Sequence, residues 1–131
     1  KAVIRIIVVD DHQLVRIGTR RLLEDEPGLN VIADAGSGEE AVELVRELKP
    51  DVVLMDIQMP EMDGLEATRQ IRAVQAGEDL HRDCEIVGLS AHAMSGDRER
   101  YMAEGMIEYL TKPIRMEELR EVLDACLDKK R

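Results

Sequence analysis

Three aspartates follow two short apolar stretches that each have the pattern of a buried strand. Residues 4–9 are mostly apolar and are followed by Asp10 and Asp11, and residues 52–55 are followed by Asp56. Parallel strands that are covered on both faces of a sheet have nearly continuous apolar runs of this kind. Because the carboxyl ends of parallel strands meet at one edge of a sheet, we expect the three carboxylates to lie close together.

Clustered carboxylates need positive charge, because two of them about 4 Å apart repel by about 4 kcal/mol at an effective dielectric constant near 20. Lys112, which follows another short apolar stretch, supplies one charge, and a hard divalent cation would supply two more. Oxygen ligands completed by water suit Mg2+. We therefore predict a Mg2+ site with Asp11 and Asp56 as direct ligands. Gln58 would add its backbone carbonyl, and Asp10 would act partly through water.

Asp56 is the predicted nucleophile of this group. A carboxylate beside Mg2+ and an ammonium group can attack phosphorus and form an acyl phosphate. Such phosphoryl transfer depends mainly on positioning and on neutralising the oxygens of the transferred group. Asp56 stands alone at its strand end, and the turn at 57–60 exposes it. Lys112 and the hydroxyl of Ser90 would then each hold one phosphoryl oxygen.

The elements that position these residues alternate along the chain. Strands are expected at 3–9, 31–35, 52–56, 85–89 and 107–110, and helices at 12–26, from Ser37 to before Pro50, from Asp63 onward, at 96–104 and at 115–128. This order predicts an α/β fold, a doubly wound five-stranded parallel sheet of flavodoxin-like strand order 2-1-3-4-5 with helices on both faces.

Spacing inside the predicted helices indicates how two of them begin or pack. The helix at 12–26 has an apolar side made of Leu14, Val15, Gly18, Leu22 and Leu23. Ser37 and Glu40 have the spacing of a capping box, which would begin the second helix.

The length of 131 residues predicts one domain, spanning residues 1–131. The net charge of −10 argues against direct binding to nucleic acid or anionic membranes, which need basic patches. No apolar run approaches the roughly 20 residues that cross a bilayer.

Cys84 and Cys126 lack metal-like spacing, so free thiols in a cytoplasmic protein are expected, with a disulfide left open. The three histidines, His12, His81 and His92, form no plausible metal set.

Five short motifs stand at the strand ends in order. They are Val8-Val-Asp-Asp11, Leu54-Met-Asp-Ile-Gln-Met-Pro60, Met62-Asp-Gly64, Leu89-Ser-Ala91 and Tyr109-Leu-Thr-Lys-Pro113. Each is weak alone, but as an ordered set they resemble the receiver domain of bacterial two-component response regulators, over residues 3 to about 127. The resemblance implies a signalling domain that supports its own phosphorylation and dephosphorylation and is not a turnover enzyme.

The resemblance also assigns the site residues. It implies that Asp56 accepts a phosphoryl group from a phosphohistidine on a sensor histidine kinase or phosphotransfer protein. It implies Mg2+ at Asp10, Asp11 and Asp56. Ser90 and Lys112 would be the phosphoryl ligands.

A conformational switch follows from the same resemblance. Ser90 would move toward the new phosphoryl oxygen and vacate space for Tyr109, the aromatic switch residue. The surface made by residues 96–104, 107–110 and 115–128 would then change for an output domain or partner. Gln58 and His92 occupy the positions that tune phosphoryl lifetime, but their polar side chains predict no particular lifetime.

Three alternatives stay open. An aspartyl-nucleophile phosphatase on a similar sheet usually has a second acid two residues after the nucleophile, where this chain has Gln58. A receiver-like scaffold would bind partners without phosphorylation. Residues 10–16 resemble regulators with a helix-turn-helix output domain, whereas residues 89–114 resemble receivers of hybrid sensor kinases, which suggests a chimeric or engineered sequence.

Overall fold

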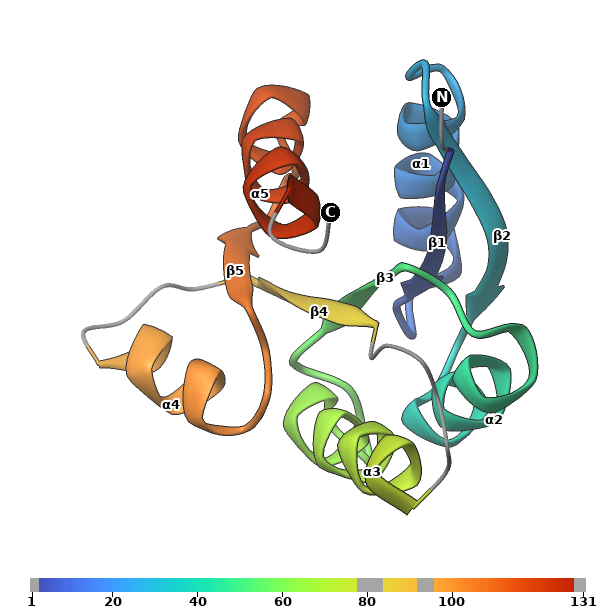
Figure 1. Ribbon diagram of the computed structural model, residues 1–131. Coiled ribbons are helices and arrows are strands. Elements are labelled where there is room, and N and C mark those ends of the chain that lie inside the picture. Colours follow the sequence, from blue (N-terminus) through green and yellow to red (C-terminus); the bar gives the residue numbers. More distant parts are fainter. Residues whose placement is uncertain (1–2, 78–83, 92–95, 129–131) are drawn as a thin grey trace.

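The computed structural model describes residues 3–77, 84–91 and 96–128, and in these residues strands and helices alternate (Figure 1). The strands are β1 (Ile4–Val9), β2 (Leu29–Ala35), β3 (Val52–Asp56), β4 (Glu85–Ser90) and β5 (Glu108–Thr111). The helices are α1 (Gln13–Glu24), α2 (Gly38–Leu48), α3 (Gly64–Gly77), α4 (Asp97–Ala103) and α5 (Met116–Asp128). Predicted and observed ends differ slightly, the usual uncertainty of helix and strand boundaries.

The strands form one parallel sheet in the order β2-β1-β3-β4-β5, as predicted. β2 begins earlier than expected because Leu29 and Asn30 already pair with Ile4 and Arg5. Figure 1 shows α1 and α5 on one side of the sheet and α2, α3 and α4 on the other. The α/β fold class is therefore confirmed. β1 and β3 are neighbours, and this brings the ends of both acidic strands together.

Successive strand side chains point to opposite faces of the sheet, so each strand contributes to two core layers. The layer under α2, α3 and α4 includes Ile7, Val9, Val53, Met55 and Ile86. The layer under α1 and α5 includes Ile6, Val8, Val52, Leu54, Val87, Leu23, Leu119 and Leu123. No helix in the described ranges is long and apolar enough to cross a membrane.

Most residues of the apolar side predicted for α1 are exposed to solvent. Of the five residues assigned to it, only Leu23 is buried, and Leu14 is 84% exposed. Val15 and Leu22 are also exposed, and with Gly18 they line a groove between α1 and the loop after β5. Helical spacing correctly indicated an apolar side, but it did not indicate that this side packs in the core.

The predicted capping box begins α2 with one small difference. The Ser37 Oγ accepts a hydrogen bond from the Glu40 amide at 3.1 Å. Glu40 Oε1 accepts in return from the amide of Gly36, at 2.9 Å, one residue before the expected Ser37 amide. Two amides near the helix start thus find side-chain acceptors, which stabilises the end of the loop after β2.

Candidate functional site

The structure places the three predicted carboxylates at the carboxyl edge of the sheet. Asp10 follows β1 and Asp56 ends β3, and both residues are only 1% exposed. The expectation that the turn at 57–60 exposes Asp56 was therefore wrong, because Asp56 is the last residue of a fully buried strand. Together with Asp11 and His12 they offer ligand atoms that lie within 4.8 Å of one another. Aliphatic strands bury these side chains because each acid directly follows a run of core residues. The result is a compact group of oxygen atoms at the junction of β1 and β3.

Lys112 connects both buried carboxylates. Its Nζ lies 3.1 Å from Asp10 Oδ2 and 3.1 Å from Asp56 Oδ1. The Lys112 amide donates to the carbonyl of Ser90 at 2.8 Å, which ties the end of β5 to the end of β4. Lys112 follows the edge strand β5 and extends toward the ends of β1 and β3, so one ammonium group lies beside two carboxylates.

The pKa of both partners is shifted in this group. Burial raises the pKa of Asp56 above its ordinary value, and the nearby charge of Asp10 adds to this, although Lys112 opposes it. Burial acts to lower the pKa of Lys112, but its contacts with Asp10 and Asp56 outweigh burial, so this pKa is raised. The lysine thus stays charged, while the Asp56 carboxylate is incompletely compensated.

Two carboxylate oxygens have no hydrogen-bond partner among the described residues. They are Asp11 Oδ1 and Asp56 Oδ2, and both atoms are buried. Leaving a buried acceptor unsatisfied is costly unless a cation or water supplies the missing interaction. The two atoms belong to the pair predicted to ligate Mg2+ directly. An all-oxygen donor set with unsatisfied acceptors fits a hard divalent cation.

One oxygen of Asp10 and one of Asp56 accept backbone hydrogen bonds. Asp10 Oδ1 accepts from the His12 amide at 2.8 Å, and Asp56 Oδ1 accepts from the Gln58 amide at 3.2 Å. Gln58 is therefore beside the site through its backbone, while the residue as a whole is exposed. Ser90 is fully buried at the end of β4. His92 lies outside the described residues.

His12 is also part of the group, although it was not assigned there from the sequence. Its Nδ1 lies 3.2 Å from Asp11 Oδ1 and 3.6 Å from Asp10 Oδ1. The residue immediately follows the two aspartates at the start of α1, and this position was the signal that could have found it. His81 and His92 lie outside the described residues, so the expectation about the three histidines as a set stays a prediction.

Gly64 brings the start of α3 against the acceptor residue. A Cβ at this position would lie 2.3 Å from the carbonyl oxygen of Asp56, which no real side chain could tolerate without movement. The Gly64 amide donates to the carbonyl of Ile57 at 2.9 Å, and Asp63 Oδ1 accepts from the Glu66 amide to cap the helix. Glycine thus allows the loop after β3 to close tightly around Asp56.

Tyr109 lies on β5, away from the acidic group, and is half-buried. Its ring meets the ring of Tyr101 edge to face, with centroids 5.2 Å apart and an interplanar angle of 86°. Tyr101, on α4, is buried and was not identified from the sequence. Edge-to-face aromatic pairs are favourable, so this contact stabilises the observed orientation of Tyr109.

Known proteins agree with the motif pattern. The family description "response regulator receiver domain" matches residues 6–124. The response regulator GacA of Pseudomonas viridiflava is 45% identical over 109 residues, which are 83% of this chain and 48% of that protein. The response regulator UvrY of Escherichia coli is 43% identical over 109 residues, which are 83% of this chain and 47% of UvrY. The chain spans about half the length of the curated relatives it matches.

Solved structures agree as well. A LuxR-family two-component response regulator from Aurantimonas sp. SI85-9A1 has a TM-score of 0.85 at 37% identity, covering 98% of this chain and 87% of that one. The receiver domain of the putative response regulator NarL from Mycobacterium tuberculosis has a TM-score of 0.80 at 30% identity, covering 98% of this chain and 96% of that one.

Proposed function

This chain belongs to the response regulator receiver domain family, and from this membership we propose that it is a phosphorylation-dependent signalling receiver with Asp56 as phosphoryl acceptor. Receiver domains of this family are generally signalling modules without turnover activity. The observation that carries the proposal is the state of Asp56: its Oδ2 is buried with no hydrogen-bond partner in the described part of the chain, and Lys112 Nζ lies 3.1 Å from its Oδ1.

In the proposed reaction, an Asp56 carboxylate oxygen attacks the phosphorus of a phosphohistidine. The new oxygen–phosphorus bond forms as the nitrogen–phosphorus bond breaks, and the leaving imidazole keeps the electron pair and takes up a proton. Lys112 would turn from the carboxylates toward one phosphoryl oxygen, and the Ser90 hydroxyl would donate to another. The raised pKa of Lys112 keeps it a cation throughout.

The raised pKa of Asp56 supports a role for a cation in this reaction, since a protonated carboxyl group is a poor nucleophile. Asp11 and Asp56 would hold Mg2+ directly, with the Gln58 carbonyl as a further ligand and Asp10 acting partly through water. Bound Mg2+ would supply the charge that keeps Asp56 ionised and neutralises the transferred group. The unsatisfied oxygens of Asp11 and Asp56 support this assignment.

The same proposal extends to the response. Ser90 at the end of β4 would move toward the phosphoryl group, and Tyr109 would leave its contact with Tyr101 and turn inward. The α4–β5–α5 face would then change for an output domain or partner. Gln58 and His92 would affect the phosphoryl lifetime. The edge-to-face pair of Tyr101 and Tyr109 gives the starting state of this switch a defined geometry.

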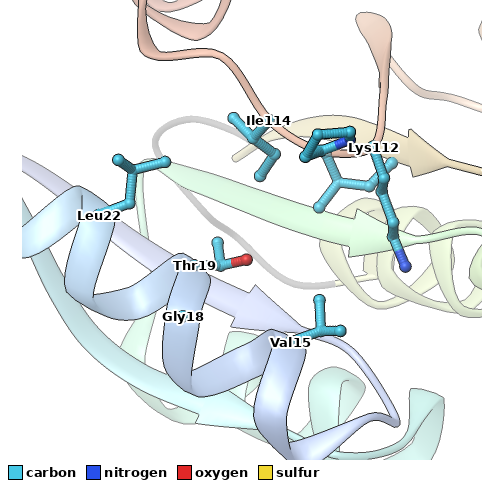
Figure 2. A pocket seen from close by; sticks show the side chains of 8 residues that line it. Val15, Gly18, Thr19, Leu22, Lys112 and Ile114 are labelled. Atoms are coloured by element: carbon cyan, nitrogen blue, oxygen red, sulfur yellow. The ribbon is translucent and has the colours of Figure 1, made fainter.

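A groove beside the site supports the proposed kinase partner (Figure 2). It encloses about 410 Å³ between α1 and the loop after β5. Its lining is mostly apolar and consists of Val15, Gly18, Thr19, Leu22, Leu89, Lys112, Pro113 and Ile114. Gly18 has no atom within 4 Å of where a Cβ would be, which leaves room for a partner helix to approach. A kinase or phosphotransfer helix docked here would present its phosphohistidine near Lys112 and Asp56.

The proposal gives this domain no direct role in binding nucleic acid, which its net charge of −10 supports. The proposal also places this domain in the cytoplasm, where response regulators typically act. The phosphatase alternative lacks support, because Gln58 occupies the position of the second acid. The proposal treats residues 1–131 as one receiver domain.

The proposal is tested by intact mass after incubation with Mg2+ and a small acyl phosphate donor. We expect one added phosphoryl group, absent without Mg2+ and absent in Asp56→Asn. Labelling retained in Asp56→Asn would assign the acceptor to another residue. If the folded protein gains no mass, binding of a beryllium fluoride complex, a phosphoryl mimic, would show a short-lived phosphoryl group; no binding would favour the scaffold alternative.

A further inference from the structure

Arg16, on α1, joins the first aspartate of the site to β2. Its Nη1 donates to the backbone carbonyl oxygen of Asp10 at 2.7 Å, and its Nε donates to Asp34 Oδ1 at 2.9 Å. The side chain is only 19% exposed. Hydrogen bonds from a guanidinium group are charge-assisted, and its planar fork fixes the directions of its donors. The arginine therefore ties three elements together directly behind the carboxylates.

The carbonyl that Arg16 contacts belongs to the peptide bond between Asp10 and Asp11. This peptide unit is rigid and planar, so the direction of its oxygen determines where the Cα of Asp11 lies. The Asp10 amide is already held by the carbonyl of Ala35, at 3.0 Å. With the amide side fixed by β2 and the carbonyl side fixed by Arg16, Asp11 has a defined starting position.

The space around the guanidinium group is restricted on the side of β2. A Cβ at Gly36 would lie 3.2 Å from Arg16 Nη1, closer than most real Cβ contacts. Asp34 supplies the counter-charge from the same strand. The guanidinium group thus lies beside Gly36, just after β2, and reaches the carbonyl of Asp10, just after β1.

We propose that Arg16 is a positioning residue for the cation site. It holds the Asp10–Asp11 peptide in the orientation that presents Asp11 to the metal. This inference rests on the proposed Mg2+ function, in which Asp11 is a direct ligand. It is consistent with the buried Asp11 Oδ1, which has no hydrogen bond among the described residues, although His12 Nδ1 lies 3.2 Å away.

Arg20 provides a matched control on the same helix. It also pairs with Asp34, through Oδ2, and its other hydrogen bond goes to Glu24. Substituting Arg20 therefore removes a guanidinium contact with Asp34 and leaves the bond from Arg16 to the Asp10 carbonyl. A loss of Mg2+ affinity that arises from the Asp34 ion pair or from net charge would occur in both variants.

The test is Mg2+ titration by calorimetry of the wild-type chain, Arg16→Met, Arg16→Lys and Arg20→Met, with urea unfolding in EDTA to verify folding. We expect Arg16→Met to weaken Mg2+ binding by about 10- to 100-fold, the usual effect of removing a residue that orients a metal ligand. Arg20→Met should retain the wild-type affinity. Arg16→Lys keeps the charge without the planar fork, so it should also bind weakly.

Equal losses in Arg16→Met and Arg20→Met would overturn the proposal, as would wild-type affinity in Arg16→Lys, which would show that charge alone matters. If Arg16→Met does not fold, Arg16→Lys against Arg20→Met decides the question. If the wild-type chain does not bind Mg2+, the proposed cation fails. The NMR amide resonance of Asp11 in metal-free protein then tests positioning by itself: it should change with Arg16→Lys and not with Arg20→Met, and an unchanged resonance would overturn the inference.

Discussion

Asp56 is subject to opposing influences on its protonation. Burial and the charge of Asp10 favour the neutral acid, whereas Lys112, 3.1 Å away, favours the carboxylate. The net result is a raised pKa, so the folded protein holds an ionised Asp56 less favourably than the unfolded chain does. The group that the proposed reaction needs ionised is therefore one that destabilises the metal-free fold, a familiar compromise at functional sites.

At the residue scale, we predict that Asp56→Asn stabilises the metal-free protein at pH 7. A raised folded-state pKa contributes stability that is fully present below the unfolded pKa and is lost as pH rises through the folded pKa. Asparagine keeps the shape without that loss, so the free energy of unfolding should rise by about 1 kcal/mol, the usual size of a single-residue effect.

Urea unfolding in EDTA at several pH values measures this difference. It should shrink as pH falls below the raised pKa, because the wild-type residue then becomes neutral as well. A less stable Asp56→Asn at pH 7 would show instead that the contact with Lys112 outweighs burial and the repulsion from Asp10.

At the scale of elements, the loop between β3 and α3 closes so tightly that backbone meets backbone. Gly64 is the position where this matters, because a Cβ there would lie 2.3 Å from the Asp56 carbonyl oxygen. Gly18 is the contrasting case: it lies within α1, and nothing lies within 4 Å of its added Cβ. The same type of residue thus serves packing in α3 and leaves open surface on α1.

We predict opposite effects of alanine at these two glycines. Gly64→Ala should lower the free energy of unfolding by about 1–3 kcal/mol, because a rigid backbone oxygen cannot move aside cheaply. It should also lower the phosphorylation yield, since the residue that must shift is Asp56. Gly18→Ala should raise the free energy of unfolding by about 0.5–1 kcal/mol, because alanine is the better helix former.

Urea unfolding of Gly64→Ala and Gly18→Ala, each against the wild-type chain, measures both changes in the free energy of unfolding. The phosphorylation yield is a second measurement for Gly64→Ala. Equal stability of the two variants would contradict the close approach of α3 to the acceptor loop.

At the scale of the whole molecule, negative charge is in excess, with a net charge of −10. Self-repulsion of this kind destabilises a compact state and is weakened by salt. A site-bound cation acts differently, because it binds only the folded chain and stabilises it by mass action. Screening and specific binding can therefore be separated by comparing salts.

We predict that MgCl2 stabilises the protein more than NaCl does at the same ionic strength. The excess should reach about 2.7 kcal/mol when Mg2+ is present at about 100 times its dissociation constant. Thermal unfolding in the two salts measures it. Asp11→Asn should remove most of the excess and keep the NaCl effect, and identical stabilisation by the two salts would argue against a specific site.

The sequence by itself determined the fold class, the neighbouring positions of the three acids and the family. Continuous apolar runs between helical repeats allow few topologies, and parallel strands deliver their carboxyl ends to one edge. That rule is independent of side-chain detail. It therefore predicted that Asp10 and Asp56 would lie close together. It also predicted that Lys112 would lie near them, although 102 residues separate Lys112 from Asp10.

Only the tertiary structure decided which neighbours each side chain has. The helical pattern of α1 is the same whether its apolar side is covered or open, so burial at Leu23 and exposure at Leu14 could not be distinguished. Likewise, no motif indicates that Arg16 reaches a backbone carbonyl or that Tyr101 meets Tyr109. Periodicity reports the direction of a side chain relative to its own element, whereas contacts depend on how separate elements pack.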